Sequence, residues 1–392
     1  METSLYDLSP VFHILLVGAI CAALPLAWVA WAHRNASWQG KLRALGLVTL
    51  FLTFDLVLFG AFTRLTDSGL GCPDWPGCYG SASPLGAHQE ISAAQSAMPT
   101  GPVTHSKAWI EMVHRYLATS VGGLILLLAI FSWRALWRGE VPRRAWTSYL
   151  PTLSLVWVCV QGAFGALTVT MKLFPAIVSL HLLGAYLLLA LLTMQSYLGE
   201  EPPNGVSPLP NTQPLSVSSL WVVLALAMLV LQAASGAWVS TNYAVLACTE
   251  FPKCQGSWWP DMQFEHAFTW WRPLGLGAHG EAITFQGLTA IHYMHRLLAM
   301  ATIIALGSLA WHASRADRLR SLGRALAALL VLQFATGLSN VVLDWPLGAA
   351  VLHTAGAGAM VVVLVRMLCS IAPQDIHPSA HAAALHPSRS SA

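Results

Sequence analysis

The sequence predicts an all-α polytopic membrane protein with about nine spans, in which two pseudo-symmetric four-helix bundles follow one extra N-terminal transmembrane helix. Three observations lead to this prediction. Aspartate, glutamate, lysine and arginine make up only 9% of the 392 residues, against roughly 25% in a soluble domain. Apolar stretches long enough to cross a bilayer recur along the chain, and its two halves repeat the same motifs in the same order.

The composition also excludes several classes of protein. Hydrophobic residues account for 56% of the chain and there are 17 tryptophans, which excludes a soluble globular enzyme and a disordered protein. The net charge of +3 is too small for a nucleic-acid-binding protein, so no nucleic-acid partner is expected. The expected surroundings are the lipid bilayer.

A membrane helix needs about 20 mostly apolar residues. Nine stretches meet this requirement: 11–32, 43–63, 110–132, 147–169, 176–198, 218–240, 287–311, 323–343 and 348–370. The first stretch is too long for a signal peptide, and residues 1–10 contain no lysine or arginine. We therefore interpret it as a span.

The connections between spans alternate in their content of basic residues. Arginines and lysines follow the first, third and seventh spans: Arg34, Lys41, Arg43, Arg134, Arg138, Arg143, Arg144, Arg315, Arg318, Arg320 and Arg324. Because cytoplasmic connections carry the excess of lysine and arginine, the N-terminus is predicted outside and the C-terminus in the cytoplasm. The long loops 64–109 and 241–286 are then predicted to lie outside.

An internal repeat divides the chain. Matching motifs occur in one order: Gly60 with Gly236, CPDWPGC (72–78) with CTEFPKC (248–254), EMVHR (111–115) with HYMHR (292–296), QGAFG (161–165) with QFATG (333–337), and HLLG (181–184) with HTAG (353–356). The repeat predicts a like topology for the two halves. The predicted organisation is an extra helix (1–42), a first half (43–200), a linker (201–217), a second half (218–370) and a disordered cytoplasmic tail (371–392).

Four histidines lie near the outer start of predicted spans: His114, His181, His295 and His353. In each half the two histidine-bearing helices run in the same direction, so two imidazoles at one depth can face each other across the bundle. This arrangement can hold a haem iron from both sides. A hydrogen-bonded packing role is the alternative for any single histidine. Two histidines without a nearby carboxylate or thiolate make a poor closed zinc or copper site.

Glycines on the same helices leave room for close helix packing or for a flat macrocycle: Gly122, Gly123, Gly184, Gly356 and Gly358.

The two halves differ next to the first histidine of each pair. Glu111 lies three residues before His114, so their Cβ atoms are about 5–6 Å apart on one helix face, whereas His292 takes the equivalent place in the second half. The carboxylate could act as a base or stabilise a developing cation; the alternative is a glutamate that favours the helix dipole. Arg115 and Arg296 could bind haem propionates, or could extend to the membrane interface.

The outer loops carry two cysteine pairs of identical spacing, Cys72 with Cys78 and Cys248 with Cys254. An oxidising exterior and local pairing predict two intraloop disulfides. Their function is either to staple the loops or to exchange electrons near the outer surface.

Together these segments resemble the haem A synthase family, in the branch with paired loop cysteines. The resemblance covers roughly residues 43–370 and is carried by GAFTRLTDSGLGCPDWPGCYG (60–80), EMVHRYLAT (111–119), SLHLLGAY (179–186), CTEFPKC (248–254), HYMHRLLAM (292–300) and LHTAGAGA (352–359). Members usually have eight spans, so the stretch 11–32 is additional.

The resemblance implies an enzyme that oxidises the C8 methyl group of haem O to a formyl group by successive hydroxylations, giving haem A for terminal oxidases. It implies that His295 and His353 bind a haem B cofactor, that His114 and His181 hold the substrate haem, that Glu111 is the catalytic carboxylate, and that Cys72 and Cys78 transfer electrons. It also implies the inner (cytoplasmic) membrane as the location.

Two other functions stay open on the sequence alone. One is a diheme b-type electron-transfer cytochrome, and the other is a haem transporter or chaperone whose tryptophan-rich loops cradle the ligand. Partners could include the membrane proteins of haem O synthesis or oxidase assembly, or a second copy of the chain.

Overall fold

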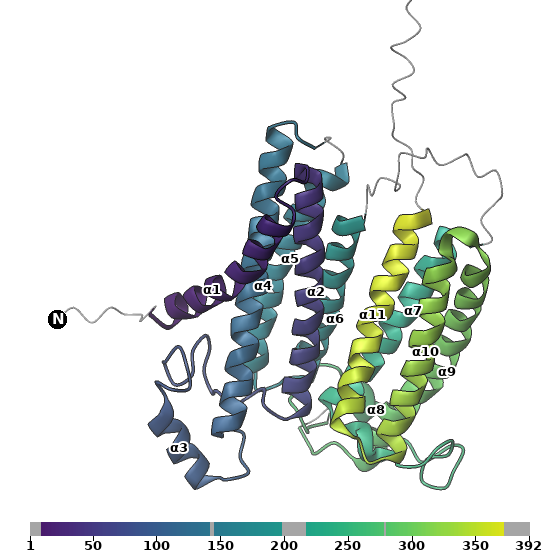
Figure 1. Ribbon diagram of the computed structural model, residues 1–392. Helices are drawn as coiled ribbons and strands as arrows, with labels where there is room; N and C mark the ends of the chain where they lie inside the picture. Colours follow the sequence, from purple (N-terminus) through teal and green to yellow (C-terminus); the bar gives the residue numbers. More distant parts are fainter. Residues whose placement is uncertain (1–8, 142–144, 198–216, 278–279, 372–392) are drawn as a thin grey trace, which may run out of the picture.

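The computed structural model describes residues 9–141, 145–197, 217–277 and 280–371. Within these ranges nine helices are long and apolar enough to cross a membrane, which confirms the predicted all-α polytopic membrane protein. They are α1 (Ser9–Ala32), α2 (Trp38–Leu65), α4 (His105–Trp137), α5 (Ala145–Thr170), α6 (Pro175–Tyr197), α7 (Ser219–Thr241), α9 (Phe285–Arg315), α10 (Arg320–Val342) and α11 (Leu347–Ile371) (Figure 1). The predicted linker and tail lie almost entirely outside the described residues.

Serine and threonine side chains define where four of these helices begin. The hydroxyl oxygens of Ser37, Thr104, Ser218 and Thr284 each accept a hydrogen bond from the backbone N–H three residues later, at the starts of α2, α4, α7 and α9. These bonds satisfy backbone donors that have no partner inside the helix. The caps extend α4 and α9 beyond the predicted spans, to 33 and 31 residues. Glu111 consequently lies in the second turn of α4.

The helices form two bundles of like connectivity. α2, α4, α5 and α6 pack together in the first half, and α7, α9, α10 and α11 in the second (Figure 1). Helices α6 and α11 meet at the centre of the interface between the bundles, with α2 on α11 and α6 on α7 at its flanks. Because α2 corresponds to α7 and α6 to α11, exchanging the halves leaves this set of contacts unchanged. The contacts therefore describe a pseudo-twofold axis, as the repeat predicts.

Equivalent residues pair with each other across this interface, where α2 and α7 end. Arg64 donates to the carbonyl oxygen of Ser240 at 2.6 Å, and the Tyr243 hydroxyl donates to Asp67 Oδ1 at 2.6 Å. Both pairs are 176 residues apart, which is also the separation of the repeat in this segment. Partial desolvation raises the pKa of the Tyr243 hydroxyl although the residue is 40% exposed, which agrees with its role as the donor to Asp67.

The additional helix α1 packs on the outside of the first bundle against α4 and, less extensively, α2 (Figure 1). A Cβ atom added at Gly18 would lie 2.5 Å from the Thr119 methyl group, so the glycine permits a close approach of α1 to α4. One turn before Gly18, Ile14 is buried in a cluster with Cys72 and Cys78. Helix α1 therefore helps to cover the first cysteine pair.

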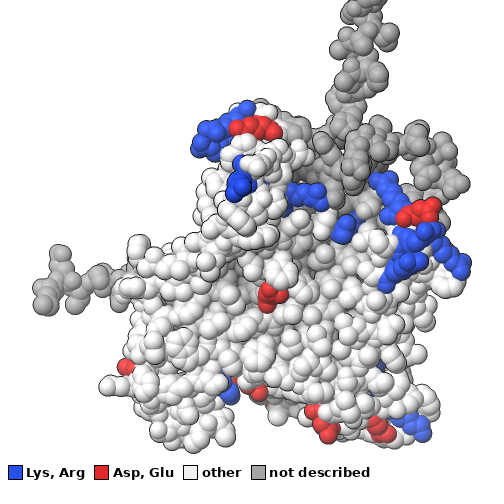
Figure 2. Space-filling view, in the orientation of Figure 1, with Lys and Arg blue, Asp and Glu red and all other residues white. Residues whose placement is uncertain are grey.

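Charged side chains are segregated along the bundle. Figure 2 shows lysine and arginine gathered at the end where α4 ends and α10 begins, with a nearly uncharged belt below it. The described basic residues outside the two long loops include Arg34, Lys41, Arg43, Arg134, Arg138, Arg315, Arg318, Arg320, Arg324 and Arg366. An uncharged belt bounded by a basic end is the distribution expected of a membrane protein whose basic end faces the cytoplasm.

Candidate functional site

The structure brings the four predicted histidines together in two pairs, one inside each bundle. His114 on α4 lies near enough to His181 on α6 to interact with it electrostatically, and His295 on α9 interacts in the same way with His353 on α11. All four are partly or fully shielded from solvent by neighbouring helices. The two histidines of each predicted pair therefore lie near each other inside one bundle, and the facing of their rings stays a prediction.

Glycines on the neighbouring helices provide the space for these imidazoles. A Cβ atom added at Gly60 or Gly236 would lie 3.0 Å from Cε1 of His114 or His295, respectively. The corresponding distance for Gly337 is 3.1 Å to Cε1 of His353. Contacts at 3.0–3.1 Å are too short for ordinary carbon atoms, so these glycines let the rings lie directly against the next helix.

The glycines predicted to leave room at the site have different surroundings. Gly122 and Gly123 have no heavy atom within 4 Å of an added Cβ. The side chains of Gln161 and Gln333 lie over Gly184 and Gly356, and the ring of Tyr186 lies over Gly358 at the interface between the halves. Gly184 and Gly356 thus accommodate a glutamine beside each second histidine, and Gly358 serves helix packing.

The donor groups in the bundles suit a haem better than a smaller metal site. Among the described residues there is no cluster of three or more histidine, cysteine, aspartate or glutamate side chains that could hold an ion. Instead, each bundle offers two buried imidazoles, and the buried Nδ1 atoms of His114 and His181 have no hydrogen-bond partner within the protein. Two facing imidazoles can supply both axial ligands of a haem iron, while the porphyrin supplies the other four. The residues present therefore fit a haem.

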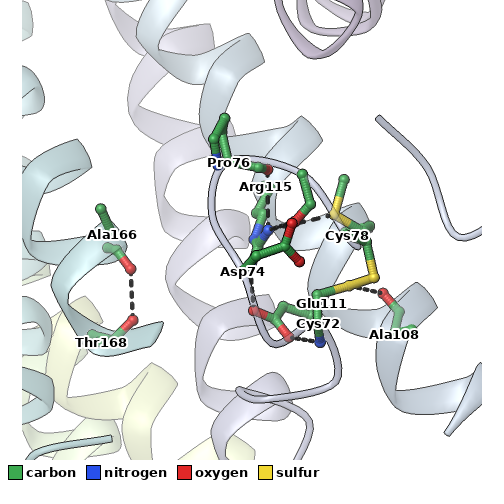
Figure 3. A network of polar contacts seen from close by, with 12 residues as sticks. Cys72, Asp74, Pro76, Cys78, Ala108, Glu111, Arg115, Ala166 and Thr168 are labelled. Atoms are coloured by element: carbon green, nitrogen blue, oxygen red, sulfur yellow. Dashed lines mark hydrogen bonds and ion pairs between the residues drawn. A yellow bond between two sulfur atoms is a disulfide. The ribbon is translucent and has the colours of Figure 1, made fainter. Parts of the chain in front are cut away.

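A buried polar network surrounds Glu111 at the end of the first bundle where the first cysteine loop lies. The carboxylate is only 3% exposed and accepts hydrogen bonds from the backbone N–H of Cys72 at 2.7 Å and from Arg115 Nη2 at 2.5 Å. Arg115 also donates to the carbonyl oxygens of Pro76 and Gly77 (Figure 3). The cysteine loop and α4 therefore hold the carboxylate in a fixed orientation three residues from His114.

The second bundle has a related network without the carboxylate. His292 Nδ1 lies 3.0 Å from the carbonyl oxygen of Ala244, and Arg296 Nε donates to His292 Nε2 at 3.2 Å. The Arg296 guanidinium also donates to the carbonyl oxygens of Cys248 and Glu250. Both halves thus use an arginine to fix the cysteine loop, but only the first half has a carboxylate three residues before the first histidine of the pair.

These contacts also describe what Arg115 and Arg296 do within the protein. Both guanidinium groups donate to carbonyl oxygens of the cysteine loops. Binding of haem propionates by these two residues stays a prediction.

The structure places each cysteine pair at bonding distance, as the sequence predicts. The Cα atoms of Cys72 and Cys78 are 4.9 Å apart and those of Cys248 and Cys254 are 5.0 Å apart. All four cysteines are at most 1% exposed. The first disulfide lies in the same loop as the N–H group that binds Glu111. Its position supports a stapling function for the loop that orients this carboxylate, and electron exchange remains a separate prediction.

Gly71 tests the close packing of this loop on α4. A Cβ atom at Gly71 would lie 2.4 Å from the Lys107 carbonyl carbon, and backbone atoms cannot move aside as a flexible side chain can. We expect Gly71→Ala to lower the free energy of unfolding by about 1–3 kcal/mol, the range for overpacked sites. Thermal unfolding of the purified protein measures this. Gly307→Ala is the matched control, because an added Cβ there meets no atom within 4 Å. Equal melting temperatures for Gly71→Ala and wild type would contradict the expectation.

Sequence reasoning missed the residues that contact the second histidine pair. Ser235 Oγ lies 2.8 Å from His295 Nδ1, and Thr336 Oγ1 lies 3.0 Å from His353 Nδ1. Ser235 and Thr336 each stand directly before a glycine of the repeat motifs, Gly236 and Gly337. A comparison of the residues next to these glycines in the two halves could have revealed them.

The protein contains two like bundles of membrane-spanning helices, and each bundle contains a pair of histidines. These features define a class of helical membrane protein suited to hold two haems. A sequence model of the family described as cytochrome oxidase assembly protein (COX15-CtaA) matches residues 43–365. The match begins after α1, which agrees with α1 being additional. The chain belongs to this family.

Curated relatives of the chain carry one name. It is 39% identical to the haem A synthase of Shewanella oneidensis over 321 residues, which cover 81% of this chain and 93% of that protein. It is 27% identical to the haem A synthase of Halalkalibacterium halodurans over 347 residues, covering 86% and 96% of the two chains. The haem A synthase of Caulobacter vibrioides is 28% identical over 343 residues, covering 80% and 90%.

Proposed function

We propose that this protein is a haem A synthase, a membrane oxidoreductase that oxidises the C8 methyl group of haem O to a formyl group and so supplies haem A to terminal oxidases. The observation that carries the proposal is the asymmetry between two otherwise matching sites. Only the first histidine pair has a buried, oriented carboxylate three residues away, that of Glu111. The two sites therefore perform different tasks.

In this proposal His114 and His181 hold the substrate haem O, and His295 and His353 hold a resident haem B. Bound haem supplies an iron centre that can take up or pass on electrons. The protein positions the histidine side chains that hold these haems. Gly60, Gly236 and Gly337 let the imidazoles of His114, His295 and His353 lie close against the next helix.

Glu111 is the catalytic carboxylate in this proposal. The hydrogen bonds from Cys72 N–H and Arg115 orient the carboxylate, whose remaining lone pairs can accept a proton from a group being oxidised beside His114. A fixed negative charge at this point would also stabilise positive charge that develops on the substrate. His292, at the equivalent position, is held by Ala244 and Arg296 and brings no negative charge.

The orientation belongs to the same proposal. The protein lies in the inner (cytoplasmic) membrane with its N-terminus outside, its C-terminus in the cytoplasm and both cysteine loops outside. The basic end of the bundle in Figure 2 supports this orientation. Membrane proteins that make haem O or assemble the oxidase are the expected partners.

Pigment extraction tests the proposed function. We expect membranes that contain the protein and a haem O supply to accumulate haem A, and membranes that contain the protein without that supply to hold haem B only. Chromatography of extracted haems distinguishes the pigments. Haem O that persists unchanged would favour a diheme electron-transfer cytochrome or a haem transporter.

A further inference from the structure

The two histidine pairs differ in what holds their imidazole rings. In the second half, a hydroxyl oxygen lies within hydrogen-bonding distance of each Nδ1 atom: Ser235 Oγ at 2.8 Å from His295 and Thr336 Oγ1 at 3.0 Å from His353. In the first half, the buried Nδ1 atoms of His114 and His181 have no partner within the protein.

The direction of these bonds follows from where each hydroxyl hydrogen goes. Ser235 Oγ donates to the carbonyl oxygen of Gln232 at 2.8 Å, and Thr336 Oγ1 donates to that of Leu332 at 2.8 Å. Each hydroxyl has one hydrogen, so it is left as an acceptor toward the imidazole. The histidine Nδ1 atom is then the protonated nitrogen, and Nε2 keeps the lone pair that binds iron.

The side-chain amide of Gln232 also lies beside His295, with Nε2 at 3.1 Å from the Nδ1 atom, while its Oε1 has no partner. The same amide nitrogen lies 3.4 Å from the backbone carbonyl oxygen of His295, so Gln232 contacts both the ring and the backbone of this histidine. The tautomer of His295 is fixed by the Ser235 hydroxyl.

The first half carries apolar residues at the equivalent positions. Phe59 stands where the second half has Ser235, Phe164 where it has Thr336, and Leu56 where it has Gln232. The Phe59 ring stacks on the His114 ring, with centroids 6.2 Å apart and planes inclined by 12°. Stacking limits the tilt of the imidazole but provides no acceptor for Nδ1–H.

A groove in the surface of the first bundle lies beside Phe164. The groove runs between α5 and α6, has a volume of about 240 Å³, and is lined by residues that include Gln161, Phe164 and Gly184. Phe164 therefore borders an opening toward the surroundings at the place where Thr336 binds a histidine in the other half.

We propose that Ser235 and Thr336 are positioning residues that make the His295–His353 pair a permanent haem site, and that Phe59 and Phe164 leave the His114–His181 pair as a site where haem exchanges. The inference rests on the proposed function, since an enzyme that converts one haem with the help of another must release the first and retain the second. The hydroxyl groups beside His295 and His353 favour retention of haem, and their absence beside His114 and His181 favours exchange of haem.

Haem retention tests this inference without a measurement of turnover. We expect Ser235→Ala and Thr336→Val each to speed transfer of haem from the purified full-length protein to excess apomyoglobin by about 10- to 100-fold, the usual effect of losing a residue that orients a metal ligand. The midpoint potential of the haem should also become more positive, because an imidazole without this acceptor is a weaker donor to ferric iron.

Matched variants separate positioning from packing. Thr336→Ser keeps the hydroxyl and should retain haem as wild type does. Thr302→Val on α9 removes a buried hydroxyl whose recorded bond is to its own helix, at Leu298, so it should change neither quantity. Phe164→Thr supplies the missing acceptor and should slow the loss of haem from the first pair.

The outcomes distinguish this inference from the proposed function. Wild-type transfer rates and potentials in both Ser235→Ala and Thr336→Val, with haem bound through His295 and His353, would overturn the inference and leave the proposed function intact. A wild-type protein that carries no haem on His295 and His353 would overturn both.

Discussion

Glu111→Gln is expected to abolish haem A formation while the protein keeps its bound haem. Glutamine preserves the size of the side chain and can still accept the hydrogen bond from Cys72 N–H, but it cannot accept a proton as a base or provide a negative charge. Loss of a general base lowers a rate by about 10²- to 10⁴-fold. The measurement is the ratio of haem A to haem O extracted from membranes that contain the variant and a haem O supply.

Glu140→Gln is the matched control for this experiment. Glu140 follows the same helix at its opposite end, where it is exposed and lies 3.9 Å from Arg138. That substitution should leave haem A production unchanged. Normal haem A levels in Glu111→Gln would refute the catalytic assignment. A simple electron carrier or a haem transporter has no need of this carboxylate, so it should tolerate the substitution.

His295→Ala and His353→Ala are each expected to remove most of the resident haem B from the purified protein. Loss of a group that only orients a metal ligand costs about 10- to 100-fold in affinity, so loss of the ligand itself should cost at least as much. The low-spin haem absorbance per protein, together with the pyridine haemochrome, measures the effect. The spectrum should lose its low-spin character because one axial imidazole is absent.

His312→Ala provides the comparison for the histidine variants. His312 lies on α9 like His295 but near its other end, is exposed, and has its Nδ1 atom 2.9 Å from the carbonyl oxygen of Ser308. It should keep the wild-type spectrum. Unchanged low-spin absorbance in both His295→Ala and His353→Ala would exclude this pair as the haem B ligands.

The two experiments address different halves of one molecule. Glu111→Gln should stop the reaction with both haem sites intact, whereas His353→Ala should empty the second site with the Glu111 network intact. The networks share no residue, because Arg115 and the first cysteine loop hold Glu111 while Thr336 contacts His353. Their effects on haem content should therefore be separable.

Much of the fold follows from local sequence properties. A stretch of about 20 apolar residues must form a helix in hydrocarbon, since every backbone polar group needs a partner there. For this reason all nine predicted spans match observed helices. The ends were less accurate: α4 begins at His105 rather than 110, because Thr104 caps the helix outside the apolar stretch. The repeat also predicted a like topology for the two halves and one pair of histidines in each.

Side-chain partners at the sites could not be predicted in this way. Glu111 was singled out by its spacing from His114, but its contact with Cys72 joins residues 39 positions apart. For Arg115 the sequence left propionate binding and extension to the membrane interface open, and it gave no sign of the bonds from this side chain to the carbonyl oxygens of the cysteine loop. Such contacts depend on the path of the cysteine loop over α4. The periodicity of apolar residues in the sequence does not predict this path.

The sequence by itself determined that this protein is a duplicated helical membrane protein with a histidine pair in each half and one carboxylate beside the first pair. Those features depend on apolar length, on order along the chain and on spacing within one helix. Only the tertiary structure decided that Glu111 is held by Cys72 and Arg115, and that Ser235 and Thr336 bind the second pair of histidines. The physical reason is that the rotation of each helix about its axis is set by packing against its neighbours.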